Sequence, residues 1–270
     1  MSSLAHLTDR AVVAVSGPEA STFLQGLITN DTASLAESSA MYAALLTPQG
    51  KILFDFLVVS RDGGFLLDTP AATADAFVKR LTLYRLRSKV TIERRDDLAV
   101  LAGWDHAQLP EPNFADPRLA ALGHRAIVSR DAVPQDAAGP DEWHVHRLDC
   151  GVPEGADFGQ DKIFALDAGL DELHAVSFEK GCYVGQELTA RMKHRGTARK
   201  RVLPVATLDG AALAAVDVST ATTEIGSVVS TTGARGFALI RLDRFAESQG
   251  AELHVAGTPV RIIKPAWLSA

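Results

Sequence analysis

The chain has 270 residues, 47% of them hydrophobic and 22% charged, and a formal net charge of −6. This composition supports a sizeable core, as one large domain or two, and excludes the strongly basic surface of a typical nucleic-acid-binding protein. The chain has only two cysteines and no CxxC pair, which excludes a disulfide framework, and we expect no metal site of its own.

The N-terminal residues Met1–Arg10 show no basic segment followed by a long apolar stretch, so no secretory signal is predicted. The longest apolar runs, such as Ile52–Val59, have the length of a strand, far below the roughly 20 residues of a membrane span. We therefore expect a cytoplasmic protein without a membrane segment.

The first 60 residues predict a strand, a helix and a hairpin. Ala11–Val15 is an apolar, strand-length run, and Ser16 is expected to cap the helix that follows. Apolar residues then recur at helical spacing, and Asn30 is expected to end this helix. Met41–Leu46 and Ile52–Val59 predict strands, because Pro48-Gln49-Gly50 between them suits a hairpin turn.

Strands and helices continue without a regular βαβ period, which predicts an α+β fold. The further elements expected up to residue 149 are Phe65–Leu67, Ala71–Leu86, Val90–Ile92, Leu98–Leu101 and Glu142–Asp149. Gly151–Gly169 is irregular, and a long irregular segment inside a compact domain is often functional.

The character of the chain changes after residue 201. Short strands separated by Gly and Thr predict a small all-β barrel module, and they are Val205, Ile225–Val229, Phe237–Ile240 and Val260–Ile263. We therefore predict two domains, residues 1–201 and 202–270.

The segment Lys180-Gly181-Cys182-Tyr183-Val184-Gly185-Gln186-Glu187 carries the strongest functional signal. Its glycines predict a turn that needs positive φ or a close neighbour. Such a turn would expose Cys182, and nearby cations would favour its thiolate. The alternative is a cysteine that lies in a turn and has no chemical role.

This segment resembles the K-G-C-Y-x-G-Q-E signature of the folate-binding YgfZ family. Phe23–Asp31 and Leu45–Lys51 resemble the N-terminal signature of the same superfamily. The family is related to the glycine cleavage T-protein, an aminomethyltransferase, and its members assist iron–sulfur cluster assembly or repair. The resemblance implies that residues 1–201 form a folate-binding, T-protein-like domain.

The resemblance also implies roles for particular residues. Cys182 would be the chemical centre, assisted by Lys180 and Tyr183. Tetrahydrofolate, or another reduced folate, would be the cofactor. The residues implied in binding it are Asn30, Asp55, Trp143, Asp149, Gln186 and Glu187.

Trp143 and Asp149 lie on one short segment. A flat pterin suits an aromatic wall, and a carboxylate can accept hydrogen bonds from its amino-pyrimidine edge. Core packing is the alternative for Trp143, and a capping or ion-pair role is the alternative for Asp149. In the family Glu stands where this chain has Asp149.

Asp55 interrupts an apolar strand, so it either faces solvent or occupies a polar pocket. The T-protein has paired aspartates here, whereas this chain has Phe54 at the first position. For Asn30, a polar helix terminus is the alternative to a ligand contact.

A basic run from Arg191 to Arg201 follows the motif. It is either a solvated face or a docking surface for an acidic partner or a folate tail. We expect an accessory protein whose partners are iron–sulfur assembly or client proteins. The alternatives are a tetrahydrofolate-dependent aminomethyltransferase, which the loss of one aspartate disfavours, and an RNA-binding module, which the acidic charge makes the least expected.

Overall fold

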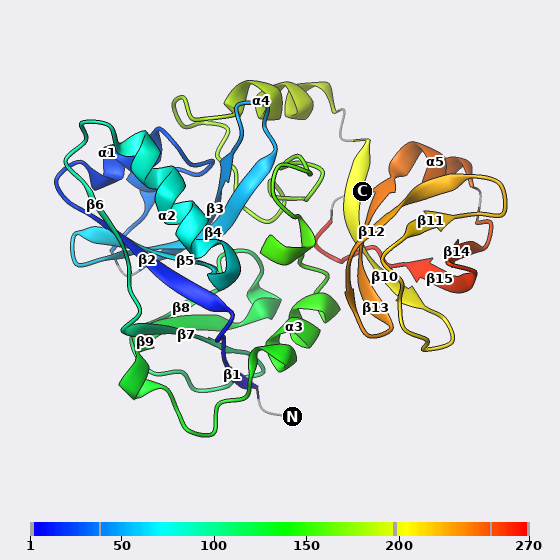
Figure 1. The fold of residues 1–270 in the computed structure, drawn as a ribbon, viewed down its shortest axis with the longest axis horizontal. Helices are drawn as coiled ribbons and strands as arrows, with labels where there is room; N and C mark the ends of the chain where they lie inside the picture. The colour runs from blue at the N-terminus through cyan, green and yellow to red at the C-terminus, as the bar shows by residue number, and fades with distance from the viewer. Residues whose placement is uncertain (1–2, 38, 197–198, 249, 269–270) are drawn as a thin grey trace.

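Two sheets and a closed barrel organise the computed structural model, which describes residues 3–37, 39–196, 199–248 and 250–268 (Figure 1). The two sheets form the core on the left of the view, and the barrel stands on the right. The predicted α+β fold is confirmed.

The larger sheet of the core has five antiparallel strands. In spatial order they are β3 (Ala40–Leu46), β4 (Ile52–Arg61), β5 (Gly64–Pro70), β2 (Arg10–Ser16) and β6 (Thr91–Arg94). Side chains alternate between the two faces of each strand. On β2, Val13 and Val15 pack with α1 (Ala20–Gln25) and α2 (Ala71–Arg85), whereas Val12 and Ala14 face the second core layer.

The second sheet and a helix build that second layer. Its four strands, in spatial order, are β1 (Leu4–His6), β7 (Leu98–Gly103), β9 (His124–Ser129) and β8 (Asn113–Ala115). The helix α3 (Pro140–Asp149) buries Trp143 and Leu148 in the cluster that also receives Val12 of β2. Short 3-10 helices lie at Thr32–Ser34, Ala120–Leu122, Arg130–Ala132 and Gly155–Asp157.

Apart from the 3-10 helix at Gly155–Asp157, residues 151–185 are irregular between α3 and α4 (Gln186–Arg195), as the sequence predicted for the first part of this segment. The segment is fixed to the β3–β4 hairpin, because Ile52 N donates to Ile163 O at 2.9 Å. Gly50 in that hairpin has φ of 78°, and its backbone lies against Gly185. The hairpin therefore supports the loop that carries Cys182.

The C-terminal part is a closed six-stranded barrel. Its strands, in order around the barrel, are β10 (Lys200–Thr207), β13 (Arg235–Arg241), β12 (Glu224–Thr232), β11 (Asp217–Ser219), β14 (Leu253–Val255) and β15 (Thr258–Ile262). Pairing of Val205 with Ile262 closes it, and α5 (Leu242–Glu247) follows β13. The predicted all-β module is confirmed, and its first strand begins two residues before the expected boundary.

Most predicted elements of the core are also confirmed, including the hairpin and the helix that begins at Ala71. Two expected helix ends are wrong. Ser16 is the last residue of β2, and α1 begins after Glu19, because Gly17 turns the chain with φ of 114°. The same helix ends at Gln25, well before Asn30, because Ile28 pairs with Leu45 of β3.

Within the described ranges, no helix has the length and apolar character needed to cross a membrane.

Candidate functional site

The loop that carries Cys182 is held at its start by Lys180. The side chain of Lys180 is buried, and its Nζ donates to the carbonyl oxygens of Ile28 at 2.8 Å and Asn30 at 2.7 Å. The ammonium also lies 5.2 Å from the centre of the Tyr183 ring, within cation–π range. Burial lowers the pKa of Lys180 to about 8, against the opposing influence of Asp31.

Glycine fixes the other end of the loop. Gly185 has φ of 84°, and a Cβ there would lie 2.5 Å from Thr47 O and 2.9 Å from Leu46 Cβ. Only glycine fits such a position without strain. Gly181 differs, since it lacks positive φ and a Cβ on it would meet no atom within 4 Å. The expected glycine requirement therefore applies to Gly185 alone.

Between these two anchors, the side chains of the loop divide into exposed and buried groups. Cys182 is exposed and carries a free thiol. The next residue, Tyr183, is buried, and burial raises its pKa to about 12. The fold thus presents the thiol outward while the neighbouring aromatic ring anchors the backbone.

The end of the motif opens α4. Gln186 is half-buried and lines a small pocket of about 210 Å³ together with Phe178 and Tyr183. Glu187 is exposed, and its carboxylate pairs with Arg191 one turn later at 2.6 Å. Glu187 therefore faces solvent.

Asn30 connects this loop to the core. Its side-chain amide donates to Tyr42 O and to His174 O, both at 2.8 Å, and its own oxygen accepts from Asp31 N. The Tyr42 hydroxyl in turn donates to Asp55 Oδ2 at 2.9 Å. Lys180, Asn30 and Asp55 therefore lie along one connected path through Tyr42.

Asp55 is buried, which decides between the two locations expected from the sequence. Burial raises the pKa of its carboxyl group, and Arg10 opposes this rise. Phe54, where the T-protein has its other aspartate, packs on the Phe77 ring of α2 at 5.0 Å. The strand therefore carries a single carboxylate, that of Asp55, where the T-protein has two.

A buried network of arginines and carboxylates surrounds this region, and sequence reasoning missed it. Its members, contributed by six separate segments, are Arg10, Asp68, Asp116, Arg118, Arg125, Arg147, Glu154 and Asp157. Arg118 reaches both Asp116 at 2.7 Å and Glu154 at 2.6 Å. Although burial alone would raise it, the charges of Arg147 and Arg118 hold the pKa of Glu154 well below its usual range. The only sequence signal was single charges inside apolar segments, such as Arg125 before Ala-Ile-Val.

Trp143 lies against this network. Its side chain is 1% exposed, and the guanidinium carbon of Arg125 lies 4.6 Å from its ring centre. Trp104 and His146 contact it at centroid distances of 6.0 and 5.9 Å. In the part of the chain that the structure describes, the indole N–H has no hydrogen-bond partner.

Asp149 lies elsewhere. Six residues along a helix correspond to about 600° of rotation, so Asp149 and Trp143 occupy different faces of α3. Asp149 is exposed and pairs with Arg235 of the barrel. The structure therefore does not bring these two residues together in one pocket.

This arrangement does not fit the folate site implied by the resemblance. A pterin stacked on Trp143 would have to displace Arg125, Trp104 or His146. Displacing Arg125 would also break its ion pairs with Asp68 and Asp116.

Several cations of the basic run are already engaged. Arg191 pairs with Glu187, Lys193 with Asp171 at 2.8 Å, and Arg201 with Glu172 at 2.7 Å.

Among the described residues, no group of three or more Cys, His, Asp or Glu side chains gathers in a way that could hold a metal ion.

Two family models match the chain. The GCVT N-terminal domain matches residues 3–103, and the C-terminal beta-barrel domain of CAF17 matches residues 199–270. The second match begins one residue before β10.

Curated relatives are 31–37% identical to this chain over their aligned residues. A mitochondrial iron–sulfur cluster assembly factor IBA57 homolog from Mycosarcoma maydis is 37% identical in an alignment of 227 positions that covers 75% of this chain and 56% of that protein. The mitochondrial IBA57 of Homo sapiens is 37% identical in an alignment of 236 positions that covers 76% of this chain and 66% of that protein. The chain thus spans between about half and two thirds of the relatives' length, and its location in the cell stays a prediction.

A solved structure shows the fold. The glycine cleavage system aminomethyltransferase T from Bartonella henselae has a TM-score of 0.76 at 17% identity, covering 98% of this chain and 86% of that chain. The chain therefore has the fold of this aminomethyltransferase with a closed C-terminal barrel, and its homologues are iron–sulfur cluster assembly factors of the IBA57 type.

Proposed function

We propose that this protein assists iron–sulfur cluster assembly or repair by lending the Cys182 thiolate to a cluster that a partner protein also holds. The observation that carries the proposal is an exposed thiol on a loop anchored at both ends, by Lys180 and by Gly185. The homologues are named iron–sulfur cluster assembly factors, which supports an iron–sulfur cluster as the group that the thiolate would bind.

The proposal includes a partner protein because this chain has too few cysteines to supply all the ligands of a cluster. Iron–sulfur clusters usually take four thiolates, and this chain has two cysteines. The other cysteine, Cys150, is half-buried at the end of α3, where its Sγ lies 3.8 Å from His146 Nε2. The remaining ligands would come from an assembly or client protein.

A strain that depends on this protein provides the test. Cys182→Ser is expected to reduce the activity of iron–sulfur enzymes while leaving the melting temperature nearly unchanged, because an exposed thiol contributes little packing. Cys150→Ser is the matched control and should keep the enzymes active. Full enzyme activity with the Cys182 variant would remove the thiol from the mechanism.

Reduced folate as a ligand rests on the aminomethyltransferase-type fold alone. Titration calorimetry with tetrahydrofolate tests it separately. Saturable heat would support folate binding, and its absence would remove folate from the proposal without touching the role of Cys182.

The fold also supports a second candidate, a tetrahydrofolate-dependent aminomethyltransferase. Phe54 argues against it, because the strand carries one buried carboxylate where the T-protein has two. General acid–base groups typically contribute about 10²–10⁴-fold to rate. We therefore expect no turnover with an aminomethyl-lipoyl carrier protein, and turnover typical of metabolic enzymes would reverse the order of the two candidates.

A further inference from the structure

The end of α2 and the chain that leads from it into β6 carry a dense group of positive charges. Residues 79–89 contain five cations and no Asp or Glu, in a chain whose net charge is −6. All five cations are exposed, and they are Lys79, Arg80, Arg85, Arg87 and Lys89. Figure 1 shows this end of α2 on the side of the core away from the barrel.

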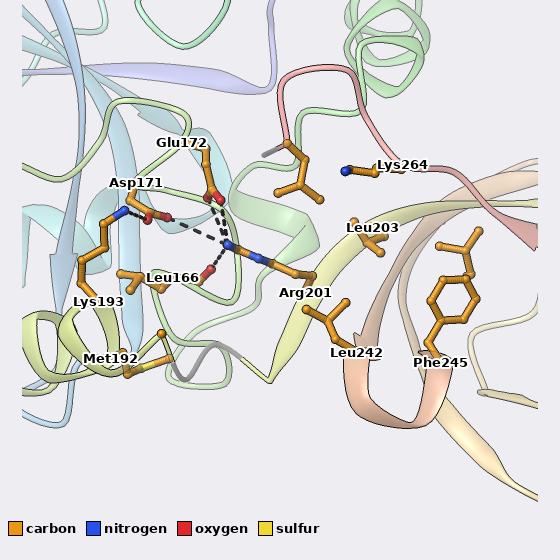
Figure 2. A pocket seen from close by; sticks show the side chains of 13 residues that line it. Leu166, Asp171, Glu172, Met192, Lys193, Arg201, Leu203, Leu242, Phe245 and Lys264 are labelled. Atoms are coloured by element: carbon orange, nitrogen blue, oxygen red, sulfur yellow. Dashed lines mark hydrogen bonds and ion pairs between the residues drawn. The ribbon is translucent and has the colours of Figure 1, made fainter. Parts of the chain in front are cut away.

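These five side chains make no ion pair and no hydrogen bond with the part of the chain that the structure describes. Cations elsewhere on the surface are often paired. Figure 2 shows two of them at the junction with the barrel, where Lys193 pairs with Asp171 and Arg201 with Glu172. The charges at the end of α2 are therefore free to meet an anionic partner.

Acidic side chains near this group neutralise little of it. Asp75, the acid that precedes the run in the sequence, pairs with Arg94 at 3.0 Å. Glu19 lies at the edge of the group, where its carboxylate accepts a hydrogen bond from Lys89 N at 2.8 Å. The local excess of positive charge remains.

Two leucines project among the cations. Leu83 is 63% exposed and Leu86 is 86% exposed. The buried residues Ala74, Phe77 and Leu81 mark the face of α2 that packs on the core, and at about 100° per residue Leu83 lies nearly opposite that face. Leu86 follows the helix with φ of 47°, a conformation that leucine rarely adopts. An exposed apolar group with a polar rim is typical of a docking surface.

Leucines surrounded by lysines and arginines fit the surface of an anionic bilayer. Leucine side chains enter the boundary of the acyl chains there, while long basic side chains keep their charges among the headgroups. Clusters of four to eight Lys and Arg on a helix are typical of this kind of binding. An acidic protein fits less well, because Lys is depleted from protein interfaces and Leu is under-represented among the residues that dominate their affinity.

We propose that the end of α2 docks this protein on a bilayer that contains anionic lipids. Leu83 and Leu86 enter the interface, and the five cations bind lipid headgroups. The proposal goes beyond the proposed function and does not depend on it, because the Cys182 loop contributes no residue to this surface.

Co-sedimentation of the full chain with lipid vesicles tests the docking. We expect binding to vesicles of phosphatidylcholine and phosphatidylglycerol mixed three to one, weak binding to phosphatidylcholine alone, and release from the anionic vesicles by high salt. Leu86→Ser should weaken binding to the anionic vesicles about tenfold, the change that corresponds to about 1.4 kcal/mol. The double variant Arg80→Gln, Arg87→Gln should weaken it by at least as much. Each changed side chain is exposed, so the variants should melt as the wild type does.

Matched controls lie on the barrel. Leu208 is 58% exposed, and Arg261 and Lys264 are exposed cations that have no ion pair within the described ranges. Leu208→Ser and the double variant Arg261→Gln, Lys264→Gln remove the same kind of side chain and the same charge, and both should bind the anionic vesicles as the wild type does.

Three results would overturn the proposal. Equal binding to anionic and neutral vesicles would exclude recognition of charge. Unchanged affinity of Leu86→Ser would leave only non-specific attraction between charges. Absence of binding to either kind of vesicle would exclude a bilayer and leave an acidic protein as the partner of this surface.

Discussion

The ammonium of Lys180 donates a 2.7 Å hydrogen bond to the carbonyl oxygen of Asn30, 150 positions earlier in the chain. The Asn30 side chain in turn donates a hydrogen bond to the backbone oxygen of Tyr42, and the Tyr42 hydroxyl donates one to Asp55. The loop that exposes Cys182 is thereby attached to the buried charges of the core.

Removing this ammonium should loosen the loop. Lys180→Met would leave the buried carbonyls of Ile28 and Asn30 without their donor, and each unsatisfied group costs about 1–3 kcal/mol. For the two carbonyls together, we expect urea denaturation to show a loss of about 2–6 kcal/mol. Lys51→Met, which removes only a partly exposed contact with Asp161, is the control and should change stability by less than about 0.5 kcal/mol. Equal stabilities of the two variants would contradict the anchoring role.

The two glycines of the motif should respond differently to the same substitution. Gly185→Ala places a Cβ 2.5 Å from Thr47 O at a positive φ, so we expect a loss of at least about 1–3 kcal/mol. Gly181→Ala meets open space, and its effect should stay within about 0.5 kcal/mol. Thermal melting of both variants measures the difference. A Gly185→Ala protein as stable as Gly181→Ala would show that the loop does not depend on this turn.

Local patterns in the sequence predicted much of the fold, because turn chemistry and strand alternation act over a few residues. The Pro48-Gln49-Gly50 hairpin and the strand at Val205 are examples. The Cys182 loop was recognisable for the same reason, since its residues are contiguous. Whether Asp149 shared a pocket with Trp143 was less predictable, because the answer depends on where α3 packs.

The buried network could not be predicted in this way. Arg125 reaches Asp68, 57 positions away, and Arg118 reaches Glu154, 36 positions away. A single charge inside an apolar segment, such as Arg125, does not show in the sequence which distant residue is its partner. Only the tertiary packing of two sheets brings the charges together and excludes water from them.

Breaking that network should be costly. Glu154→Gln removes a charge that faces Arg118 and Arg147, and the loss of one partner from a buried ion pair typically costs about 3–5 kcal/mol. Glu187→Gln is the control, because its ion pair with Arg191 is exposed and should contribute about 0–1 kcal/mol. Urea denaturation of both variants at pH 7 provides the comparison. A small effect of Glu154→Gln would mean that solvent reaches the network.

Asp167 supplies a pH-dependent prediction. It is 6% exposed, and burial raises its pKa from 3.8 to about 6, against the opposing charges of Lys200 and Arg201. The folded state therefore binds the proton more tightly than the unfolded chain does, so this contribution to stability is fully present below pH 3.8 and is lost as the pH rises through 6. A shift of about two pKa units, at about 1.4 kcal/mol each, sets an upper limit of about 3 kcal/mol.

Asp167→Asn removes this titration. We expect the variant to be more stable than the wild type by about 1–2 kcal/mol at pH 7 and to match it near pH 4, where the native carboxyl is protonated. Urea denaturation of both proteins at several pH values between 4 and 7 measures the difference, in which the titration of the other carboxylates cancels. A difference that does not change with pH, or one that favours the wild type at pH 7, would show that the ionised Asp167 is stabilised by Lys200 and Arg201 more than burial penalises it.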